Sequence, residues 1–279
     1  MAQANSLAGL DLMAADTVVQ DYGKWLIYGA QGSGKSTLAA SVAELGPTLY
    51  IDLIGERGVR SFQGAPYAEN IKVVRPQSVT QFDDLYWALD KGDHGFSCVV
   101  IDSLTSVQRM ALKFVMGLSE DKVREIAQGQ APADQRTWGQ SLNIMSDVAI
   151  FWNSLADGNR KRPMHVVMTA QVKMIEDEIN QETNRQPDVQ KGALSSVLAA
   201  PDYVLYTEVE DDLDNYVDGA PGVRHVVRIG PHSGFRTKGR IPQNLRGKIP
   251  PVLGRGKNTT NLAQLSRILG IGGVTAPTA

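Results

Sequence analysis

The chain has 279 residues, of which 42% are hydrophobic, so it can bury a sizeable core as one large domain or two small ones. Its single cysteine, Cys98, excludes internal disulfides and cysteine-rich zinc sites, and no apolar run reaches the length of a membrane span. The segment after Met1 lacks the basic stretch and long apolar core of a secretory signal, so we expect a cytoplasmic protein without a membrane partner.

The formal net charge of −2 conceals an uneven distribution of charge along the chain. From Gly219 onward there are ten Lys and Arg and no acidic residue, which leaves 18 basic and 30 acidic residues in the first 218. This asymmetry indicates an anionic partner, or a contact between the basic part of one subunit and the acidic body of the next. A solvated basic face is the plainer alternative.

The strongest motif in the chain follows an arm of 22 small and mildly apolar residues, which is either flexible or an oligomer contact. Residues 24–28 form a short apolar run typical of a buried parallel strand, and residues 37–43 have the pattern of a helix. Between them lies GAQGSGKST, residues 29–37, which matches the phosphate-binding P-loop G-x-x-x-x-G-K-[ST].

A P-loop binds phosphate because its glycines let consecutive backbone N–H groups point inward, beside the positive end of a helix. Lys35 is expected to reach the β- and γ-phosphates of a nucleotide, and Ser36 to ligate Mg²⁺. The residues expected to form the nucleotide site are Gly29, Ala30, Gln31, Gly32, Ser33, Gly34, Lys35, Ser36 and Thr37.

A second strand, residues 48–52, ends in a polar segment interrupted by glycine, residues 53–58. A carboxylate just past a strand end in such a protein lies on the ligand side of the sheet. Glu56 is therefore a candidate for orienting or activating the attacking water, and Asp52 is its rival. The alternative for either residue is that it only stabilises the turn after the strand and has no catalytic role.

The next strong signal is a run of four apolar residues that ends in Asp102. Before it, residues 71–76 predict a short strand, and Ser78 is expected to cap a helix that runs to Leu89. A buried strand that ends in aspartate some distance after a P-loop is the Walker B pattern, whose carboxylate holds Mg²⁺ through a water. Cys98, inside this strand, is expected to be an inert core residue.

The number of strands between the P-loop and Asp102 bears on the class of P-loop protein. Nucleotide kinases and GTPases usually have the Walker B strand beside the P-loop strand, whereas RecA, helicase and AAA+ proteins have another strand between them. Two candidate strands precede Asp102, which favours the second group. The chain also has no guanine-reading N-K-x-D motif and no L-S-G-G-Q signature of ABC proteins.

Beyond Asp102 we expect a helix over residues 103–117, a polar segment over 118–136 and a long helix over 137–156. A buried strand, residues 163–171, then ends in Gln171, a side chain that can touch a γ-phosphate and report its loss. The polar stretch 172–195 is expected to be a long functional or disordered loop.

The last part of the chain is expected to contribute a further strand, an acidic turn and a hairpin-like pair of strands. These are followed by a segment rich in Pro, Gly and basic residues, a short amphipathic helix and a flexible tail. In chain order the expected elements are the strand 202–208, the turn 210–214, the paired strands 224–229 and 235–240, the segment 241–258, the helix 261–269 and the last ten residues.

In this order of parts the chain resembles the RecA-like P-loop ATPases of phages, and most closely the Sak-type single-strand annealing and recombination proteins. The resemblance covers roughly residues 22–255. It rests on GAQGSGKST, on YIDLIGERG after the second strand, on VVIDS, on the helix that begins at Trp138, on HVVMTAQ and on the late basic FRTKGR.

The resemblance implies an α/β fold with a RecA-like core, a mostly parallel sheet flanked by helices, and an antiparallel, basic C-terminal extension. It divides the chain into an N-terminal arm (1–22), the ATPase core (23–255) and a short helix with a flexible tail (256–279).

The resemblance also implies roles for single residues. Glu56 matches the water-activating glutamate, although many relatives carry this carboxylate sooner after the strand, so Asp52 stays open. Gln171 matches the switch glutamine. Lys238 and Arg240 match a K-x-R that reaches the ATP of the neighbouring subunit as an arginine finger; a solvated strand edge is the plainer alternative. Segments 118–136 and 172–195 would be DNA-binding loops.

The function so implied is an ATPase with ATP and Mg²⁺ that binds single-stranded DNA, oligomerises as a filament or ring, and is stimulated by DNA and assembly. A single-stranded DNA-binding protein is a further implied partner. The alternative is a nucleotide-gated assembly module that recruits replication or packaging partners without its own DNA contact. A small-molecule kinase is disfavoured by the extra strand and by the lack of an obvious lid.

Overall fold

A computed structural model of the chain gives the fold. Its described residues are 6–7, 10–11, 22–53, 55–118, 133–177, 182–217, 220–255 and 260–271. In the arm, β1 (Ser6–Leu7) and β2 (Leu10–Asp11) form an antiparallel pair. The rest of the arm before Tyr22, most of the predicted DNA-binding segment 118–136 and the last eight residues lie outside the described part.

A ten-stranded mixed sheet forms the centre of the molecule, in the order β12-β10-β9-β3-β7-β6-β4-β5, with β8 paired to β7 and β11 to β9. The six strands from β9 to β5 run parallel, and β8, β10, β11 and β12 pair antiparallel. This confirms the predicted fold, a mostly parallel sheet with an antiparallel C-terminal extension. The strands are β3 (Lys24–Gly29), β4 (Thr48–Asp52), β5 (Ile71–Val74), β6 (Cys98–Asp102), β7 (His165–Asp177), β8 (Glu182–Pro187), β9 (Tyr203–Val217), β10 (Ala220–Arg228), β11 (Lys238–Gly239) and β12 (Val252–Leu253).

One strand, β7, lies between the P-loop strand β3 and the Walker B strand β6, as predicted for the RecA, helicase and AAA+ group. The strand that separates them comes after β6 in the chain, and the two candidate strands before Asp102 became β4 and β5 on the far side. In the parallel register, Gly29 lies opposite Gln171. The ends of β3, β6 and β7 therefore meet at one edge of the sheet.

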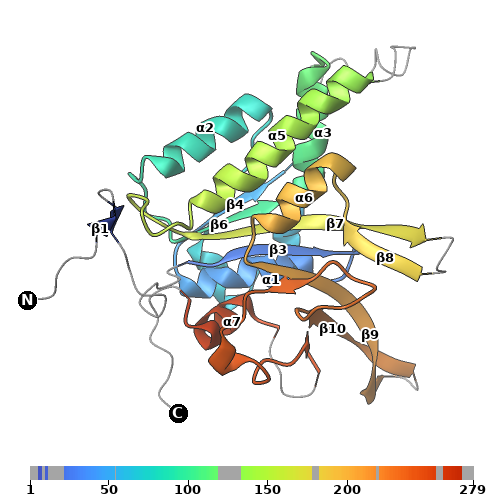
Figure 1. Cartoon of the computed structure of the whole chain (residues 1–279). Helices are drawn as coiled ribbons and strands as arrows, with labels where there is room; N and C mark the ends of the chain where they lie inside the picture. The colour runs from blue at the N-terminus through green and yellow to red at the C-terminus, as the bar shows by residue number, and fades with distance from the viewer. Residues whose placement is uncertain are drawn as a thin grey trace, which may run out of the picture.

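Helices cover both faces of the sheet (Figure 1). Helices α2, α3, α5 and α6 lie on one face, and α1 and α7 lie on the other. None of the helices in the described ranges is long and apolar enough to cross a membrane. The helices are α1 (Lys35–Ala40), which continues as the 3-10 turn η2 (Ser41–Leu45), α2 (Val79–Asp90), α3 (Leu104–Val115), α5 (Gln135–Ser154), α6 (Lys191–Ala199) and α7 (Leu262–Leu269), with further 3-10 turns η3 (Gly58–Ser61), η4 (Pro66–Asn70) and η6 (Gln243–Leu245).

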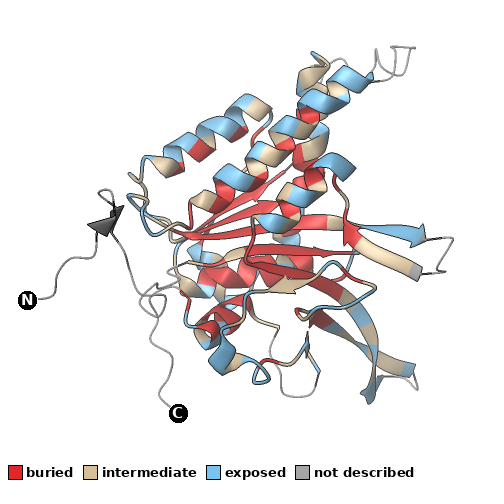
Figure 2. Cartoon of the chain, in the orientation of Figure 1, coloured by how far each residue is buried: buried red, intermediate tan, exposed pale blue. Residues whose placement is uncertain are grey.

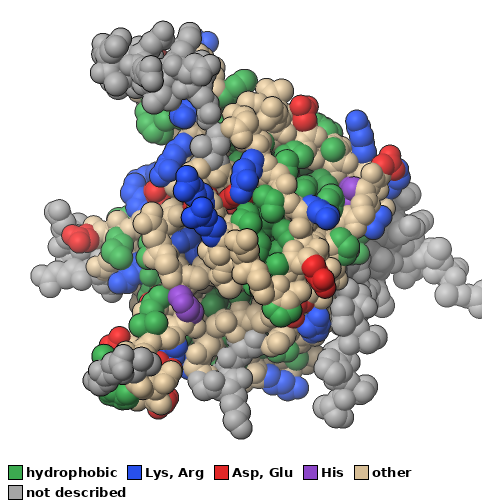
Figure 3. Space-filling view, turned by 180° about the vertical axis from the view of Figure 1, so that it is seen from behind, with side chains coloured by type: hydrophobic (Ala, Val, Ile, Leu, Met, Phe, Trp, Pro, Cys, Tyr) green, Lys and Arg blue, Asp and Glu red, His purple; other side chains and the backbone are tan. Residues whose placement is uncertain are grey.

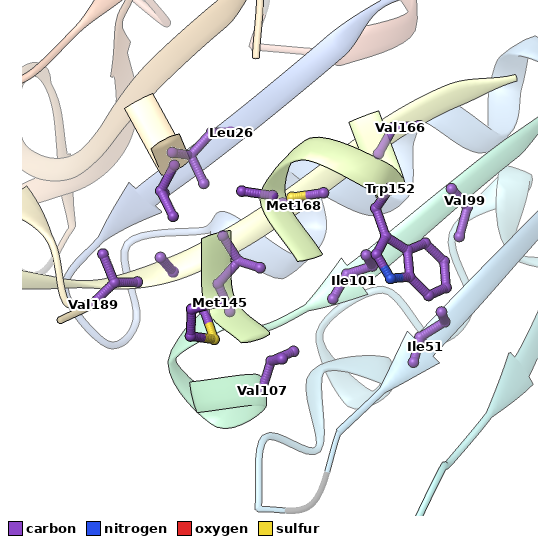
Figure 4. Close-up of a cluster of buried hydrophobic side chains, with 14 of the residues drawn as sticks. Leu26, Ile51, Val99, Ile101, Val107, Met145, Trp152, Val166, Met168 and Val189 are labelled. Atoms are coloured by element: carbon purple, nitrogen blue, oxygen red, sulfur yellow. The ribbon is translucent and has the colours of Figure 1, made fainter. Parts of the chain in front are cut away.

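The core consists of two apolar layers, one under each set of helices, and the strands are buried where they lie between these helices (Figure 2). On the α5 face, Trp152 packs among Ile51, Ile101 and Val99 (Figure 4) and stacks on Phe82 with 4.7 Å between ring centroids. Continuous apolar strands of this kind are typical of a parallel sheet covered on both faces. The core holds the ends of β3, β6 and β7 in fixed positions.

The prediction of a long loop over 172–195 is wrong. Strand β7 continues to Asp177 and pairs antiparallel with β8, with Val172 opposite Pro187, and the chain then enters α6. The two strands satisfy one another's backbone hydrogen bonds, and residues 173–176 are exposed. A ribbon that projects into solvent needs no apolar face, which is why its polar sequence resembles that of a loop.

Two predictions about the C-terminal strands are also wrong. The expected acidic turn 210–214 lies inside the long strand β9, which pairs with β10. The expected partner of β10 within 235–240 pairs with β9 instead, where Lys238 lies opposite Val204. Acidic residues can occupy this strand because arginines of β10 lie beside them and balance their charge. Arg228, for example, is 2.5 Å from Glu208.

About half of the cations in the basic C-terminal part pair with acids of the same chain. Arg255 pairs with Glu210, and Arg240 lies 2.7 Å from Asp202. Of its nine cations within the described residues, five form such ion pairs: Arg224, Arg228, Arg240, Arg255 and Arg267. The sequence asymmetry therefore overstates the positive charge available to a partner.

Candidate nucleotide site

The P-loop joins the end of β3 to the start of α1. Gly32 and Gly34 have φ angles of 75° and 89°, in the left-handed region that glycine adopts at little cost. The Ser33 hydroxyl donates to the Ala30 carbonyl at 2.8 Å and lies 2.7 Å from the hydroxyl of Thr207 on β9. The loop is thus tied to its own backbone and to a neighbouring strand.

Lys35 is 93% buried within the loop. Its Nζ donates to the carbonyls of Gly29 (3.0 Å) and Ala30 (2.7 Å) and to Oε1 of Gln171 (3.3 Å). Burial lowers the pKa of the ammonium, while the charge of Asp102 opposes that shift. The positive charge is therefore held at the centre of the loop, where phosphate oxygens would stabilise it.

Ser36 and Asp102 form the candidate metal pair. The Ser36 hydroxyl donates to Asp102 Oδ2 at 2.7 Å, and the same carboxylate accepts from Tyr50 at 2.5 Å and Thr169 at 2.5 Å. Burial raises the pKa of the Asp102 carboxyl, and these three hydrogen bonds oppose the rise. A cation bound beside the carboxylate would favour its charged form.

The donor set suits Mg²⁺. A hydroxyl and one carboxylate are the oxygen ligands that this ion prefers, and it commonly takes its remaining ligands from water and phosphate. Within the described residues no group of three or more His, Cys, Asp or Glu could hold a metal.

Glu56 and Asp52, the two candidate catalytic carboxylates, have different environments. Glu56 is half-buried and accepts hydrogen bonds from Ser103 (2.6 Å) and Ser106 (2.7 Å), at the start of α3 directly after Asp102. Asp52 is buried and pairs with Arg75 at 2.7 Å. Glu56 is thus held by two hydroxyl groups of residues that follow Asp102, whereas Asp52, opposite Asp102 in the sheet, forms an ion pair.

Gly58 brings the Glu56 segment against the metal pair. A Cβ atom added to Gly58 would lie 2.2 Å from Asp102 Oδ2 and 3.0 Å from the Ser36 hydroxyl. Only glycine permits this approach without a shift of the backbone. The segment after β4 is therefore in direct contact with the residues that would hold the metal.

Sequence reasoning missed several polar residues of the site. Tyr50 and Thr169 are buried inside strands, where their hydroxyls bind Asp102, and Ser103 and Ser106 orient Glu56. The available signal was a hydroxyl side chain near the end of an otherwise apolar strand. Such residues are common in strands for reasons of packing alone, so the signal is weak without the sheet order.

Gln171 lies at the point where β7 leaves the sheet. Its backbone N–H donates to the Thr105 hydroxyl at 3.0 Å, and its side chain accepts from Lys35. From this position β7 continues into the β7–β8 hairpin, residues 172–187. The glutamine therefore connects the P-loop lysine to an exposed ribbon.

Lys238 and Arg240 lie away from the P-loop of their own chain. Lys238 Nζ donates to the carbonyls of Leu198 and Ala199 at the end of α6, on the opposite face of the sheet from α1. Arg240 pairs with Asp202, just before β9. The finger role expected from the resemblance thus requires the nucleotide of another subunit.

A cleft of about 540 Å³ adjoins the P-loop. Besides residues 32–38, its walls include Tyr67, the exposed His225 of β10 and Asn261 at the start of α7. An aromatic ring and an imidazole beside a phosphate-binding loop can hold the ribose and base of a nucleotide. The C-terminal extension therefore contributes to the same cleft as the P-loop.

Of the comparisons with known proteins, the match to a family model bears on this site. Residues 22–241 match the family described as AAA domain. No match to the chain is found among curated proteins. Among solved structures, the P4 protein from bacteriophage phi6 in complex with ADP is similar at 14% identity and a TM-score of 0.29, over 82% of this chain and 62% of that chain. The chain thus spans less than two thirds of the P4 length, and a likeness this remote supports no conclusion about function.

The family match covers well over half of the chain, and the chain therefore belongs to the AAA domain family of P-loop ATPases.

Proposed function

We propose that the chain is an ATPase that binds single-stranded DNA in an ATP-dependent manner and acts as an oligomer in DNA recombination or annealing. The observation that carries the proposal is the 3.3 Å contact between Lys35 Nζ and Gln171 Oε1. It joins the nucleotide site to the strand that continues into the β7–β8 hairpin. Residues 173–176 of the hairpin are exposed, and the hairpin contains most of the segment that the resemblance associates with DNA.

The chemistry follows from the side chains at the sheet edge. Lys35 stabilises negative charge on the β- and γ-phosphates, and Glu56 accepts a proton from the attacking water while Ser103 and Ser106 hold its carboxylate. When bound by Ser36 and Asp102, Mg²⁺ neutralises charge on the phosphate oxygens. Loss of the γ-phosphate changes the contacts of Lys35, and with them the position of Gln171.

Replacing Gln171 by alanine is expected to leave nucleotide affinity intact and to abolish the effect of ATP on DNA affinity. Coupling between two sites typically changes affinity by about 5- to 150-fold, and the variant should retain less than about twofold. Fluorescence anisotropy of a labelled oligothymidylate, with and without a non-hydrolysable ATP analogue, measures this effect of the nucleotide on DNA affinity. The exposed Gln264→Ala on α7 is the matched control. If the Gln171→Ala variant still binds DNA more tightly with the ATP analogue, Gln171 does not couple the nucleotide site to DNA.

A nucleotide shared between subunits is expected to be detected by mixing two inactive variants. Arg240→Ala subunits keep Glu56, and Glu56→Gln subunits keep Arg240, so mixed oligomers regain some complete sites and hydrolyse ATP faster than either variant alone. Arg240 must leave Asp202 to act in this way. Mixing Arg240→Ala with the double variant Glu56→Gln/Arg240→Ala is the control, and it should give no gain. Equal rates in both mixtures would argue against a finger in trans.

A second candidate is a nucleotide-gated assembly module that recruits replication or packaging partners without touching DNA. The internal ion pairs of the C-terminal cations favour it, because they reduce the charge left for phosphates. In that case we expect light scattering to detect assembly of the chain when the ATP analogue is added. The same chain should show no binding of oligothymidylate at low salt.

A further inference from the structure

Two adjoining hollows lie on the outer side of the segment that carries Glu56. The larger, of about 720 Å³, lies between residues 52–64 and β5, and the smaller, of about 450 Å³, lies against α3. Both linings include Leu53, so the two hollows are neighbours, and we call them together the depression. The larger hollow is separate from the P-loop cleft, with which it shares no lining residue.

This depression is strongly basic. Its walls carry five cations, which define the basic groove: Arg57, Arg60 and Arg75 in the larger hollow, and Arg109 and Lys113 in the smaller. The one acidic residue in either lining is Asp52, whose carboxylate is already paired with Arg75. Figure 3 shows a concentration of Lys and Arg side chains in the upper part of the face seen from behind.

Four of the five cations of the groove have no acidic partner among the described residues. Within the described residues, Arg57, Arg60, Arg109 and Lys113 form no ion pair, and the three arginines are exposed. Like charges gathered in a hollow repel one another and attract anions. Arg57 also has a φ of 52°, a conformation that is uncommon for residues other than glycine and that concentrates at ligand sites.

An exposed aromatic side chain borders the same groove. Phe114 on α3 is 55% exposed and lines the smaller hollow beside Lys113. Cations that follow a phosphate backbone, together with an aromatic ring on which an unpaired base can stack, are the recurring elements of single-strand binding sites.

We propose that the basic groove binds the phosphate backbone of single-stranded nucleic acid, with a base stacked on Phe114. The inference rests on the proposed function for the class of ligand. It goes further by adding to the β7–β8 hairpin a second contact with the strand, in the groove formed by the 55–64 segment, β5 and α3, without the C-terminal cations.

The position of the groove connects the bound strand to hydrolysis. Arg57 follows Glu56 directly, and Ser106, in the wall of the smaller hollow, donates to the Glu56 carboxylate. Gly58, one residue further, lies against Asp102 and Ser36. A strand held by the groove therefore orders the segment that positions Glu56, and by thermodynamic linkage bound nucleotide raises affinity for the strand.

The test is a pair of matched charge reversals measured by anisotropy on oligothymidylate with the ATP analogue. Arg60→Glu/Arg109→Glu should weaken binding by roughly tenfold or more and reduce the salt slope by about 1.4, because two phosphate contacts are lost. Arg246→Glu/Lys248→Glu makes the same change of charge on two exposed cations outside the groove and should bind like the unchanged chain. Phe114→Ala should weaken binding to single strands more than to a duplex. Thermal melting of each variant checks the fold.

The outcomes separate this inference from the proposed function. If the unchanged chain binds DNA and the groove variant binds equally well with the same salt slope, the groove is wrong and the proposed function stands. If the unchanged chain binds no single strand at low salt, both are wrong. If the groove variant keeps its DNA affinity but no longer assembles in light scattering, the groove serves an acidic surface of a second copy, which also overturns the proposal.

Discussion

Replacing Lys35 by alanine is expected to lower the rate of ATP hydrolysis by at least about 100-fold and to weaken nucleotide binding. The side chain is buried in the P-loop and makes three hydrogen bonds, to Gly29, Ala30 and Gln171. Alanine would leave two carbonyls facing the phosphates without the cation that lies between them. The slower hydrolysis and the weaker nucleotide binding both follow from the loss of this one charge at the centre of the loop.

Phosphate release and the fluorescence of a labelled ATP analogue measure these two effects separately. Lys91→Ala removes an exposed lysine at the end of α2 and serves as the control, with activity and affinity unchanged. Far-UV circular dichroism shows whether the Lys35 variant keeps its fold. If its affinity and turnover match those of the control, the nucleotide does not bind at the P-loop.

Replacing Glu56 by glutamine is expected to lower the rate of hydrolysis by about 10²- to 10⁴-fold with little change in ATP affinity. Glutamine keeps an oxygen that accepts from Ser103 and Ser106, so the side chain stays in place, but an amide accepts no proton from water. A single-turnover experiment with ATP in excess of its dissociation constant isolates this step from binding.

The comparison variant is Asp52→Asn, which removes the partner of Arg75 and weakens the contact with the Gly58 N–H. It should lower the free energy of unfolding in urea by about 1–3 kcal/mol, because a buried acceptor loses its charge. Its rate of hydrolysis should fall much less than that of Glu56→Gln. The reverse order, with Asp52→Asn inactive and Glu56→Gln active, would assign the catalytic carboxylate to Asp52.

Several elements were predictable because their signals are local. The P-loop sequence requires glycines at Gly32 and Gly34, where φ is positive, and the structure has them in that conformation. Ser78 and Asn261 accept hydrogen bonds from backbone N–H groups three residues on, as expected of helix caps. Spacing and capping chemistry operate over a few residues, so they can be recognised without knowing the fold.

Other features were missed because they depend on pairing between distant residues. The β7–β8 hairpin and the outer half of β9 have polar sequences, and each is a strand because a neighbouring strand satisfies its backbone. The positive C-terminal part lost much of its charge to Glu208, Glu210 and Asp202. Neither the strand pairing nor the ion pairing can be recognised from the sequence of one of the two paired segments alone.

The amino-acid sequence by itself indicated the class of fold through the order of its motifs. It also determined the phosphate-binding turn and the strand that ends in Asp102, since each of these two is encoded in one short stretch. Only the tertiary structure decided that Ser103 and Ser106 bind Glu56 while Arg75 binds Asp52. It also decided that, within the described residues, Arg57, Arg60, Arg109 and Lys113 form no ion pair. The physical reason is that hydrogen bonds and ion pairs act over a few ångströms. Which groups come that close is decided by the order of the strands in the sheet.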